Sequence, residues 1–530
     1  MNKLSRLILY TTVLLIPIIL FRVPAASLAR FSQIDEGIYA AAGNIILHGG
    51  LMYKDAADPC GPVTPYIYAF IFSIFGPNNM AAVHTALIFL LAAICFFLYL
   101  TGRRLWGKGA GYLAALFFAI FSSLDNDYEF LIFYTEWPAV FFSIIGVYLL
   151  LQYFLNGRRL FIFLSGFALG LAFFSKQIAA FNYLHALLFV FLFTYIFRKG
   201  KGETGKAAIL ILSGFASVAA ITAAYFYING AFGDLWFWFW EYHNGFYVPA
   251  ISALDRFRSF FGSIFSAGSR FFPVNAALLL LFAAGAFSLI RRISGSRKPD
   301  KELFIEAYIF SWAFFSYLGI TYSGRGFSHY FIMLLPPLCL AAGRAVYIKS
   351  RYRAMLLIVA ALLALAALFK FHDRLYLWEL LGRSEETIGI SGPAGELTGY
   401  IRENSSKVDK IFVWGCYPEI YGEADRLPAS RYINCNFLTG LIPWTNIGRD
   451  MDTSEFIIPM GWKIFQEEMA DGLPLFIIDT STGGHRYYGK YPPEKFIILS
   501  GLLKKYYKLD KEFFDERGEP AFRLYRNISN

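Results

Sequence analysis

The sequence has few charged residues: they make up 16% of the 530 residues, whereas hydrophobic residues make up 57%. A chain of this length cannot bury so large an apolar fraction in a soluble core. The composition therefore excludes a soluble globular protein for most of the chain. The net charge is +10, but the basic residues stand in short clusters between apolar runs. That distribution is typical of membrane proteins and does not predict a nucleic-acid partner.

Several sequence signals are also missing. Five cysteines in so long a chain exclude a disulfide framework. Cys416 and Cys435 could pair with each other, or remain two partly buried thiols. The spacing of a zinc site is absent, as are a phosphate-binding Gly-x-x-x-x-Gly-Lys loop and a Gly-x-Ser-x-Gly elbow in a usable context. There is no internal repeat, which weighs against a transporter built from duplicated halves.

The apolar runs have the length that crosses a membrane. Runs of about 17 to 25 residues suit a hydrocarbon core about 30 Å thick, and the sequence contains about eleven of them. The first run resembles a signal peptide, but only a weak cleavage site follows it, at 25–29, so we interpret it as a retained span. The predicted spans lie near 7–23, 80–100, 109–124, 136–155, 159–174, 178–197, 206–229, 273–290, 302–320, 329–348 and 354–371.

Basic clusters give these spans a direction. Every even-numbered span is followed by Lys and Arg residues, which mark cytoplasmic loops. The alternation predicts a multi-pass protein of the cell (inner or plasma) membrane with a cytoplasmic amino terminus. An odd number of spans then places the carboxyl-terminal end on the extracytoplasmic side. The clusters are Arg103, Arg104 and Lys108; Arg158 and Arg159; Arg198, Lys199, Lys201 and Lys206; Arg291, Arg292, Arg297, Lys298 and Lys301; and Lys349, Arg351 and Arg353.

The character of the chain changes after Phe371. Polar residues return, with short β-type runs at 410–414 and 475–479 and helical stretches at 395–404 and 461–470. Alternating strands and helices predict a soluble α/β domain of about 150 residues. The sequence therefore predicts two domains: a transmembrane domain over residues 1–372 and a soluble extracytoplasmic domain over residues 373–530.

Carboxylates gather in the predicted outer loops. Asp35 and Glu36 stand just outside the first span, where a carboxylate could act as a general base on an acceptor hydroxyl. Either could also hold a divalent metal, although an isolated Asp-Glu pair is commonly a solvated loop pair. The second outer loop and the start of the following span add Asp125, Asp127, Glu129 and Glu136.

Cations stand on the same predicted face, against the usual bias. Lys176 ends the fifth span, and Arg325 and His329 lie four residues apart before the tenth. That spacing puts both on one face if the turn is helical. An anionic phosphate ligand would explain them. Lys176 could instead reach the lipid interface, and Arg325 and His329 could bond a loop carboxylate. The run 236–242, rich in tryptophan, fits an aromatic belt or a sugar- or lipid-binding surface.

The order of these motifs resembles the GT-C glycosyltransferases. It is similar in particular to the group that holds lipid A aminoarabinose transferases and protein O-mannosyltransferases. The resemblance covers about residues 1–350. The stretches that carry it are Asp35-Glu-Gly-Ile-Tyr39, Gly49–Asp55, Gly61-Pro-Val-Thr-Pro65 with Phe75-Gly76, Tyr134-Thr-Glu-Trp-Pro138, Gly166–Lys176 and His329-Tyr-Phe-Ile-Met-Leu-Leu-Pro336.

The resemblance implies an enzyme that moves a sugar from a polyprenyl-phosphate donor to a hydroxyl of a lipid, glycan or protein acceptor, with inversion. By position, Asp35 would be the base, and Glu36 or Glu136 would orient it. Lys176, Arg325 and His329 would meet the donor phosphate. Asp127 and Glu136 would form an acidic second loop. A divalent cation, Mg²⁺ or Mn²⁺, remains open, with Asp35 and Glu136 as its candidate ligands.

The chain departs from the aminoarabinose transferases at one place. Those enzymes carry a lysine before the paired prolines of the first loop, whereas this chain reads Asp58-Pro-Cys-Gly-Pro62. Two other functions also stay open. A transporter or flippase of lipid-linked saccharides would place ionisable residues inside its spans, whereas these lie at span ends. A ligase that moves a whole glycan would differ only in the shape of its cavity.

Overall fold

The structure of the chain is a computed structural model. It describes residues 15–23, 33–124, 129–198, 202–262, 271–348, 353–370 and 392–529. The chain forms two compact units, each discontinuous in sequence. The first contains residues 1–25, 84–225 and 251–379, and the second contains residues 26–83, 226–250 and 380–530.

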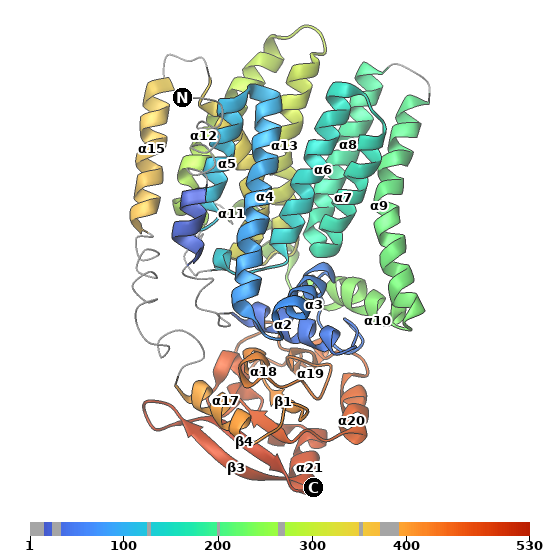
Figure 1. The fold of residues 1–530 in the computed structure, drawn as a ribbon, viewed down its shortest axis with the longest axis vertical. Coiled ribbons are helices and arrows are strands. Elements are labelled where there is room, and N and C mark those ends of the chain that lie inside the picture. Colours follow the sequence, from blue (N-terminus) through green and yellow to red (C-terminus); the bar gives the residue numbers. More distant parts are fainter. Residues whose placement is uncertain are drawn as a thin grey trace. The chain divides into compact units, whose positions relative to one another are not determined.

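The first unit is helical. Its long helices stand side by side in Figure 1, where α6, α7 and α8 form one such row. Each apolar run with described residues forms a helix, and residues 15–23 of the first run are helical too. The helices are α4 (Met80–Trp106), α5 (Lys108–Phe121), α6 (Glu136–Asn156), α7 (Leu160–Ser175), α8 (Ala180–Phe197), α9 (Glu203–Ile228), α11 (Ala253–Gly262), α12 (Phe271–Gly295), α13 (Lys301–Tyr322), α14 (Leu335–Ala345) and α15 (Arg353–Lys370).

Their length confirms the membrane prediction. Six of the described helical segments are long and apolar enough to cross a membrane. Shorter apolar helices include α5, α7 and α15. A multi-span helical membrane protein is therefore correct, while the number of eleven crossings stays a prediction.

Small residues let two of these helices approach closely. A Cβ atom on Gly166 of α7 would lie 2.1 Å from the carbonyl oxygen of Ile211 in α9. A Cβ atom on Gly214 of α9 would lie 2.1 Å from the carbonyl oxygen of Phe163. Only glycine fits at either position. Backbone contact of this kind is a main source of helix association in lipid, where burying apolar side chains gains little.

Polar side chains join other helices of the first unit. Asn182 of α8 donates to Ser143 of α6 at 3.1 Å and accepts from Ser316 of α13 at 2.9 Å. All three are buried. In hydrocarbon, polar groups pair with one another because water is absent. These bonds fix the relative placement of α6, α8 and α13, which lead to the candidate site residues.

The second unit combines two predicted outer loops with the carboxyl-terminal domain. Because the proposed boundary near residue 372 lies outside the described residues, it stays a prediction. The loop elements are α2 (Ile34–Leu47), α3 (Val63–Phe75), α10 (Phe232–Trp236) and two π-helical turns, η3 (Phe237–Glu241) and η4 (His243–Tyr247). The helices of the carboxyl-terminal domain are α17 (Pro393–Glu403), α18 (Glu419–Ala424), α19 (Asn436–Thr439), α20 (Gly461–Asp471) and α21 (Ile497–Tyr506).

This domain contains one mixed sheet with the strand order β1-β2-β4-β3. β1 (Ile411–Trp414) and β2 (Phe476–Asp479) are parallel and fully buried. They confirm the two predicted β-type runs, and α17 and α20 confirm the predicted helices. β3 (Tyr507–Phe514) and β4 (Pro520–Asn527) form an antiparallel pair that the sequence analysis did not predict.

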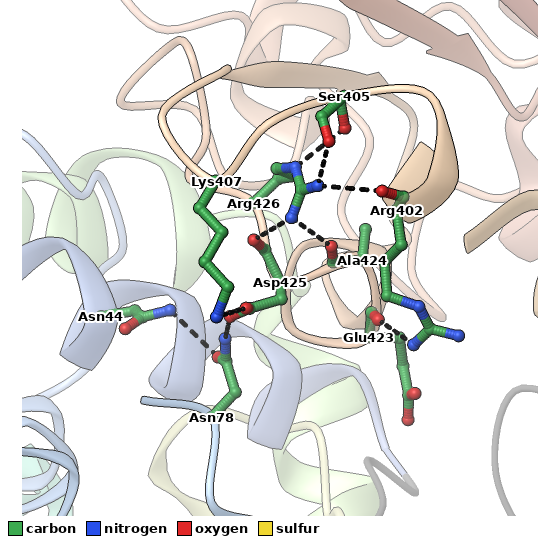
Figure 2. A network of polar contacts seen from close by, with 9 residues as sticks. All are labelled: Asn44, Asn78, Arg402, Ser405, Lys407, Glu423, Ala424, Asp425 and Arg426. Atoms are coloured by element: carbon green, nitrogen blue, oxygen red, sulfur yellow. Dashed lines mark hydrogen bonds and ion pairs between the residues drawn. The ribbon is translucent and has the colours of Figure 1, made fainter. Parts of the chain in front are cut away.

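A polar network joins the first loop to the carboxyl-terminal domain (Figure 2). Asn44 of α2 donates to Asn78 at 3.1 Å, and Asn78 donates to Asp425 at 3.0 Å. Lys407 pairs with the other oxygen of Asp425 at 3.0 Å. Asp425 has a positive φ of 54° just after α18, a conformation that Asp tolerates better than most residues.

Buried Arg426 stabilises the same corner. Its guanidinium donates to the carbonyl oxygens of Ala424, Asp425, Arg402 and Ser405 and to the Ser405 hydroxyl. Figure 2 shows these bonds converging on one side chain. Five acceptors satisfy a charged group that burial would otherwise penalise. The turn after α18 is therefore held by side-chain bonds rather than by a long helix or strand.

Asp479 at the end of β2 should make this domain less stable at neutral and higher pH than at acidic pH. Burial raises the pKa of Asp479 to about 6, although Ser481 donates hydrogen bonds to it. Because the pKa of this carboxyl is higher in the folded state than in the unfolded state, the stability of the folded state is greatest below the unfolded pKa. That stability is lost as the pH rises through the folded pKa of about 6. The shift corresponds to about 3 kcal/mol. Asp479→Asn should therefore protect β2 against hydrogen exchange at pH 8 but not at pH 4, in the full-length protein.

The control is Asp450→Asn, because Asp450 is exposed. It should leave the exchange of β2 unchanged at both pH values. Equal protection of wild type and Asp479→Asn at pH 8 would show that the Asp479 carboxylate is not destabilising.

Candidate functional site

Asp35 and Glu36 lie in the first turn of α2, within the second unit. Gln33 precedes the helix in an extended conformation without a side-chain cap bond. The positive end of the helix dipole therefore stabilises the two carboxylates. Glu36 is fully buried, whereas Asp35 is only partly buried. Of the two, Asp35 is the carboxylate that an acceptor could reach.

Tyr68 of α3 belongs to the same group. Its ring packs edge-on against Tyr39 of α2, with centroids 6.1 Å apart. Burial, followed by the negative charges of Glu36 and then Asp35, raises the pKa of Tyr68 well above its usual value. Its hydroxyl therefore stays protonated and remains a hydrogen-bond donor beside the two carboxylates. This tyrosine was not among the predicted site residues.

Within the first unit, Glu136 and Lys176 form a buried ion pair. The Lys176 Nζ lies 2.9 Å from the Glu136 Oε1. Glu136 begins α6 and its side chain is fully buried, whereas that of Lys176, which follows α7, is 15% exposed. The lysine also lies over the Tyr330 ring, 4.6 Å from its centroid. The Lys176 side chain is thus held inside the protein and does not extend to the lipid interface.

Glu129 and His329 form a second pair. The Glu129 Oε2 accepts from the backbone N–H of His329 at 2.9 Å and lies 3.2 Å from its Nδ1. The Ser328 hydroxyl donates to the same oxygen at 2.7 Å. Burial opposes ionisation of Glu129, but these bonds hold its pKa below its usual value. The His329 ring stacks on Tyr134 with centroids 4.4 Å apart. The bond to a loop carboxylate considered for His329 therefore exists.

Arg22 anchors the second loop, and the sequence analysis did not identify it. It is 2% exposed and donates to the Ser123 hydroxyl at 3.1 Å and to the carbonyl oxygen of Phe130 at 2.8 Å. Its guanidinium lies over the Trp137 ring, 5.1 Å from the centroid. A single arginine at the carboxyl-terminal end of the first apolar run was the signal that could have found it.

The remaining predicted residues have different outcomes. The turn at Arg325 is not helical, because Gly324 and Gly326 on either side have positive φ values of 73° and 59°. The condition under which Arg325 and His329 would share one helical face is therefore not met. Asp125 and Asp127 lie outside the described residues. Cys416 and Cys435 are free thiols, so the disulfide considered for them is not formed.

The described residues contain no group of three or more His, Cys, Asp or Glu side chains arranged to hold a metal ion. Glu136, one of the two candidate ligands, already has the Lys176 ammonium beside it. Among the described residues, Glu136 is therefore committed to the ion pair with Lys176.

Comparison with known proteins supports the predicted resemblance. Residues 58–223 match the family described as dolichyl-phosphate-mannose-protein mannosyltransferase. No curated protein sequence matches the chain significantly. The matched segment covers the Pro-rich part of the first loop, the second loop and Lys176, so three of the six quoted stretches lie inside it and the stretch that contains Asp35 does not.

Solved structures show the same fold. ArnT from Cupriavidus metallidurans, bound to undecaprenyl phosphate, is 12% identical, with a TM-score of 0.57 over 100% of this chain and 99% of that one. The Archaeoglobus fulgidus oligosaccharyltransferase is 15% identical, with a TM-score of 0.54 over 99% of this chain and 74% of that one. AglB from the same organism, with an inhibitory peptide and a dolichol-phosphate, is 12% identical, with a TM-score of 0.50 over 98% and 74%.

The chain thus has the fold of the GT-C glycosyltransferases, as predicted. It is a multi-span membrane protein with a carboxyl-terminal sheet-containing domain.

Proposed function

We propose that the protein is a membrane glycosyltransferase that moves a sugar from a polyprenyl-phosphate donor to an acceptor hydroxyl. The observation that carries the proposal is Lys176, a cation held at 2.9 Å by the buried Glu136 at the end of a membrane helix. It lies within the segment that matches the mannosyltransferase family. A fixed ammonium of this kind suits the phosphate that leaves during transfer.

The proposed step is a single displacement with inversion. The acceptor oxygen attacks the anomeric carbon while the bond from that carbon to the donor phosphate oxygen breaks. The acceptor proton passes to Asp35, and the lipid phosphate leaves with the electron pair of the broken bond. We assign Lys176 and Arg325 to the charge of that phosphate. His329, held through Nδ1 by Glu129, would contribute its second ring nitrogen.

The supporting residues act on these groups. Glu36, buried next to Asp35 at the start of α2, would orient the base and keep water away from it. Glu136 would set the position of Lys176 rather than hold a metal. We assign no step to Mg²⁺ or Mn²⁺, because Glu136, one of the two candidate ligands, already pairs with the Lys176 ammonium.

The proposed placement follows the loop charges. The amino terminus would lie in the cytoplasm, and the active face and carboxyl-terminal domain would lie on the extracytoplasmic side of the cell membrane. The donor would be a lipid in that leaflet, and the acceptor a lipid, a glycan or a protein. Relatives that carry either an undecaprenyl phosphate or a dolichol-phosphate support a lipid-linked donor.

The test is release of free polyprenyl phosphate by the purified protein. Donors carrying single sugars and donors carrying a whole glycan are each incubated with candidate acceptors, and the lipid phosphate is quantified. Transfer from single-sugar donors, with an inverted linkage in the product, is the expected result. Transfer from glycan donors alone would make the protein a ligase. Movement of intact donor across a vesicle membrane without bond cleavage would make it a flippase.

A further inference from the structure

The carboxyl-terminal domain contacts the helix that carries the candidate base. A Cβ atom on Gly37 of α2 would lie 2.8 Å from the backbone nitrogen of Glu419 and 3.0 Å from its Cγ. Gly37 follows Asp35 and Glu36 directly in the first turn. The start of α18 therefore packs on the backbone of α2 at a distance that only glycine permits.

Glu419 is held there by one cation. The two guanidinium nitrogens of Arg486 donate to its two carboxylate oxygens, Nη1 to Oε2 at 2.9 Å and Nη2 to Oε1 at 2.6 Å. The Glu419 side chain is 4% exposed and that of Arg486 is 28% exposed. Two parallel bonds fix direction as well as distance. A single rotation of either side chain would break both.

Arg486 is itself fixed at two further points. Its Nη1 also donates to the carbonyl oxygen of Cys416 at 2.7 Å, and its guanidinium lies 4.3 Å from the centroid of the Tyr417 ring. These two residues lead into α18. Arg486 thus joins its own loop to Cys416 and Tyr417, which precede α18, and to Glu419, the first residue of α18.

The backbone that presents Arg486 is in an unfavourable conformation. Arg486 and Tyr487 have positive φ values of 51° and 71° in succession. For residues other than glycine this region costs about 1–3 kcal/mol each. The loop keeps this conformation because the bonds of Arg486 and the burial of Tyr488 hold it. Strain of this kind is concentrated where a side chain must be directed precisely enough to serve a site.

We propose that the Glu419–Arg486 pair is the positioning element of the base: it holds α18 against α2 and so fixes the direction of Asp35. This inference rests on the proposed function, since Asp35 is the base only in that reaction. It gives the carboxyl-terminal domain a part in catalysis without contact with the substrate.

Two substitutions separate the packing of Gly37 against Glu419 from the ion pair between Glu419 and Arg486. Gly37→Ala inserts a methyl group against Glu419 and leaves the ion pair in place, whereas Arg486→Met removes the pair and leaves the glycine. A shift of about 1 Å in a catalytic group costs on the order of 100-fold in rate. Both variants should therefore lower kcat by about 10- to 100-fold, with the KM for the donor nearly unchanged. Arg486→Lys, which keeps the charge without the fork, should recover part of the loss.

A double variant distinguishes loss of positioning from loss of folding. Arg486→Met leaves the Glu419 carboxylate buried and unpaired, which alone could destabilise the domain. Glu419→Gln combined with Arg486→Met removes that charge but does not rebuild the fork. A kcat that stays low in a stable double variant supports positioning. A return to the wild-type kcat would overturn it.

The matched control is Arg523→Met. Arg523 pairs with Glu512 at 2.8 Å between β3 and β4 of the same domain. The Arg523→Met variant should have a kcat near the wild-type value. An equal loss of kcat in Arg523→Met and Arg486→Met would show that any destabilised domain has this effect, and the proposal would fail.

Hydrogen exchange separates this inference from the proposed function. In the full-length protein, residues 34–47 of α2 should lose protection in Arg486→Met and in Gly37→Ala, but not in Arg523→Met. Unchanged protection in the first two variants would overturn the inference even if the enzyme is active. If the wild type releases no lipid phosphate, the proposed function fails, while the exchange data still decide whether this pair holds α2.

Discussion

Asp35→Asn is expected to lower the rate of lipid-phosphate release by about 10²- to 10⁴-fold, the usual contribution of a general base. Asparagine has the same shape but cannot take a proton from the acceptor. Asp35 is partly buried in the first turn of α2, where loss of its charge should cost only about 0.3–1 kcal/mol of helix stability. The variant should therefore fold and fail in turnover. The measurement is single-turnover release at a saturating donor concentration.

The control is Asp55→Asn in the same loop. Asp55 is exposed, and its Oδ2 accepts a hydrogen bond from the backbone N–H of Leu51 at 2.8 Å. It carries the same charge change without a place in the proposed chemistry, so its turnover should stay close to that of wild type. Turnover by Asp35→Asn at the wild-type rate would remove Asp35 from the role of base, and Glu36 would then be examined as the proton acceptor.

Lys176→Met should damage both turnover and stability. Loss of one preorganised charge at a developing anion costs about 10²- to 10³-fold in rate. The variant also leaves the fully buried Glu136 without the ammonium 2.9 Å away. Breaking a buried pair by removing one partner typically costs about 3–5 kcal/mol. We expect a lower thermal midpoint in detergent together with the slower release of lipid phosphate.

Adding Glu136→Gln separates the two effects. The double variant no longer buries an unpaired carboxylate, so its thermal midpoint should return most of the way to that of wild type. Its turnover should remain as low as that of Lys176→Met, because no cation remains at this position. If turnover recovers together with stability, Lys176 supports the fold and does not meet the donor phosphate.

The helices of the first unit could be predicted from the sequence because each signal is local. The length and apolar composition of a run such as 136–155 predict a helix, and α6 spans nearly the same residues. The buried strands β1 and β2 were also found, since short runs of Ile, Val, Phe and Trp are typical of central strands. The β3–β4 pair was missed because its strands carry many charged residues and alternate only weakly.

The candidate site was harder to predict, because its contacts join distant residues. The sequence placed Glu136 and Lys176 on the same membrane face but assigned them to different tasks, base positioning and phosphate binding. Their ion pair depends on how α6 and α7 pack, which no local pattern encodes. The same holds for Arg22, whose partners lie about 100 residues further along. For Arg325 a local signal was present, since two flanking glycines favour a non-helical turn, and the sequence analysis had left the conformation of this turn open.

The second unit has a consequence for how this protein can be divided. Its loops at 33–83 and 226–250 and its carboxyl-terminal residues form one compact body. The contacts include the bond from Asn78 to Asp425 and an ion pair, 3.5 Å long, between Asp234 and Arg431. A boundary drawn along the sequence at residue 372 would separate these partners. The second unit is therefore made of three segments of the chain, 26–83, 226–250 and 380–530. A chimaera between relatives would keep these contacts intact only if all three segments were exchanged together.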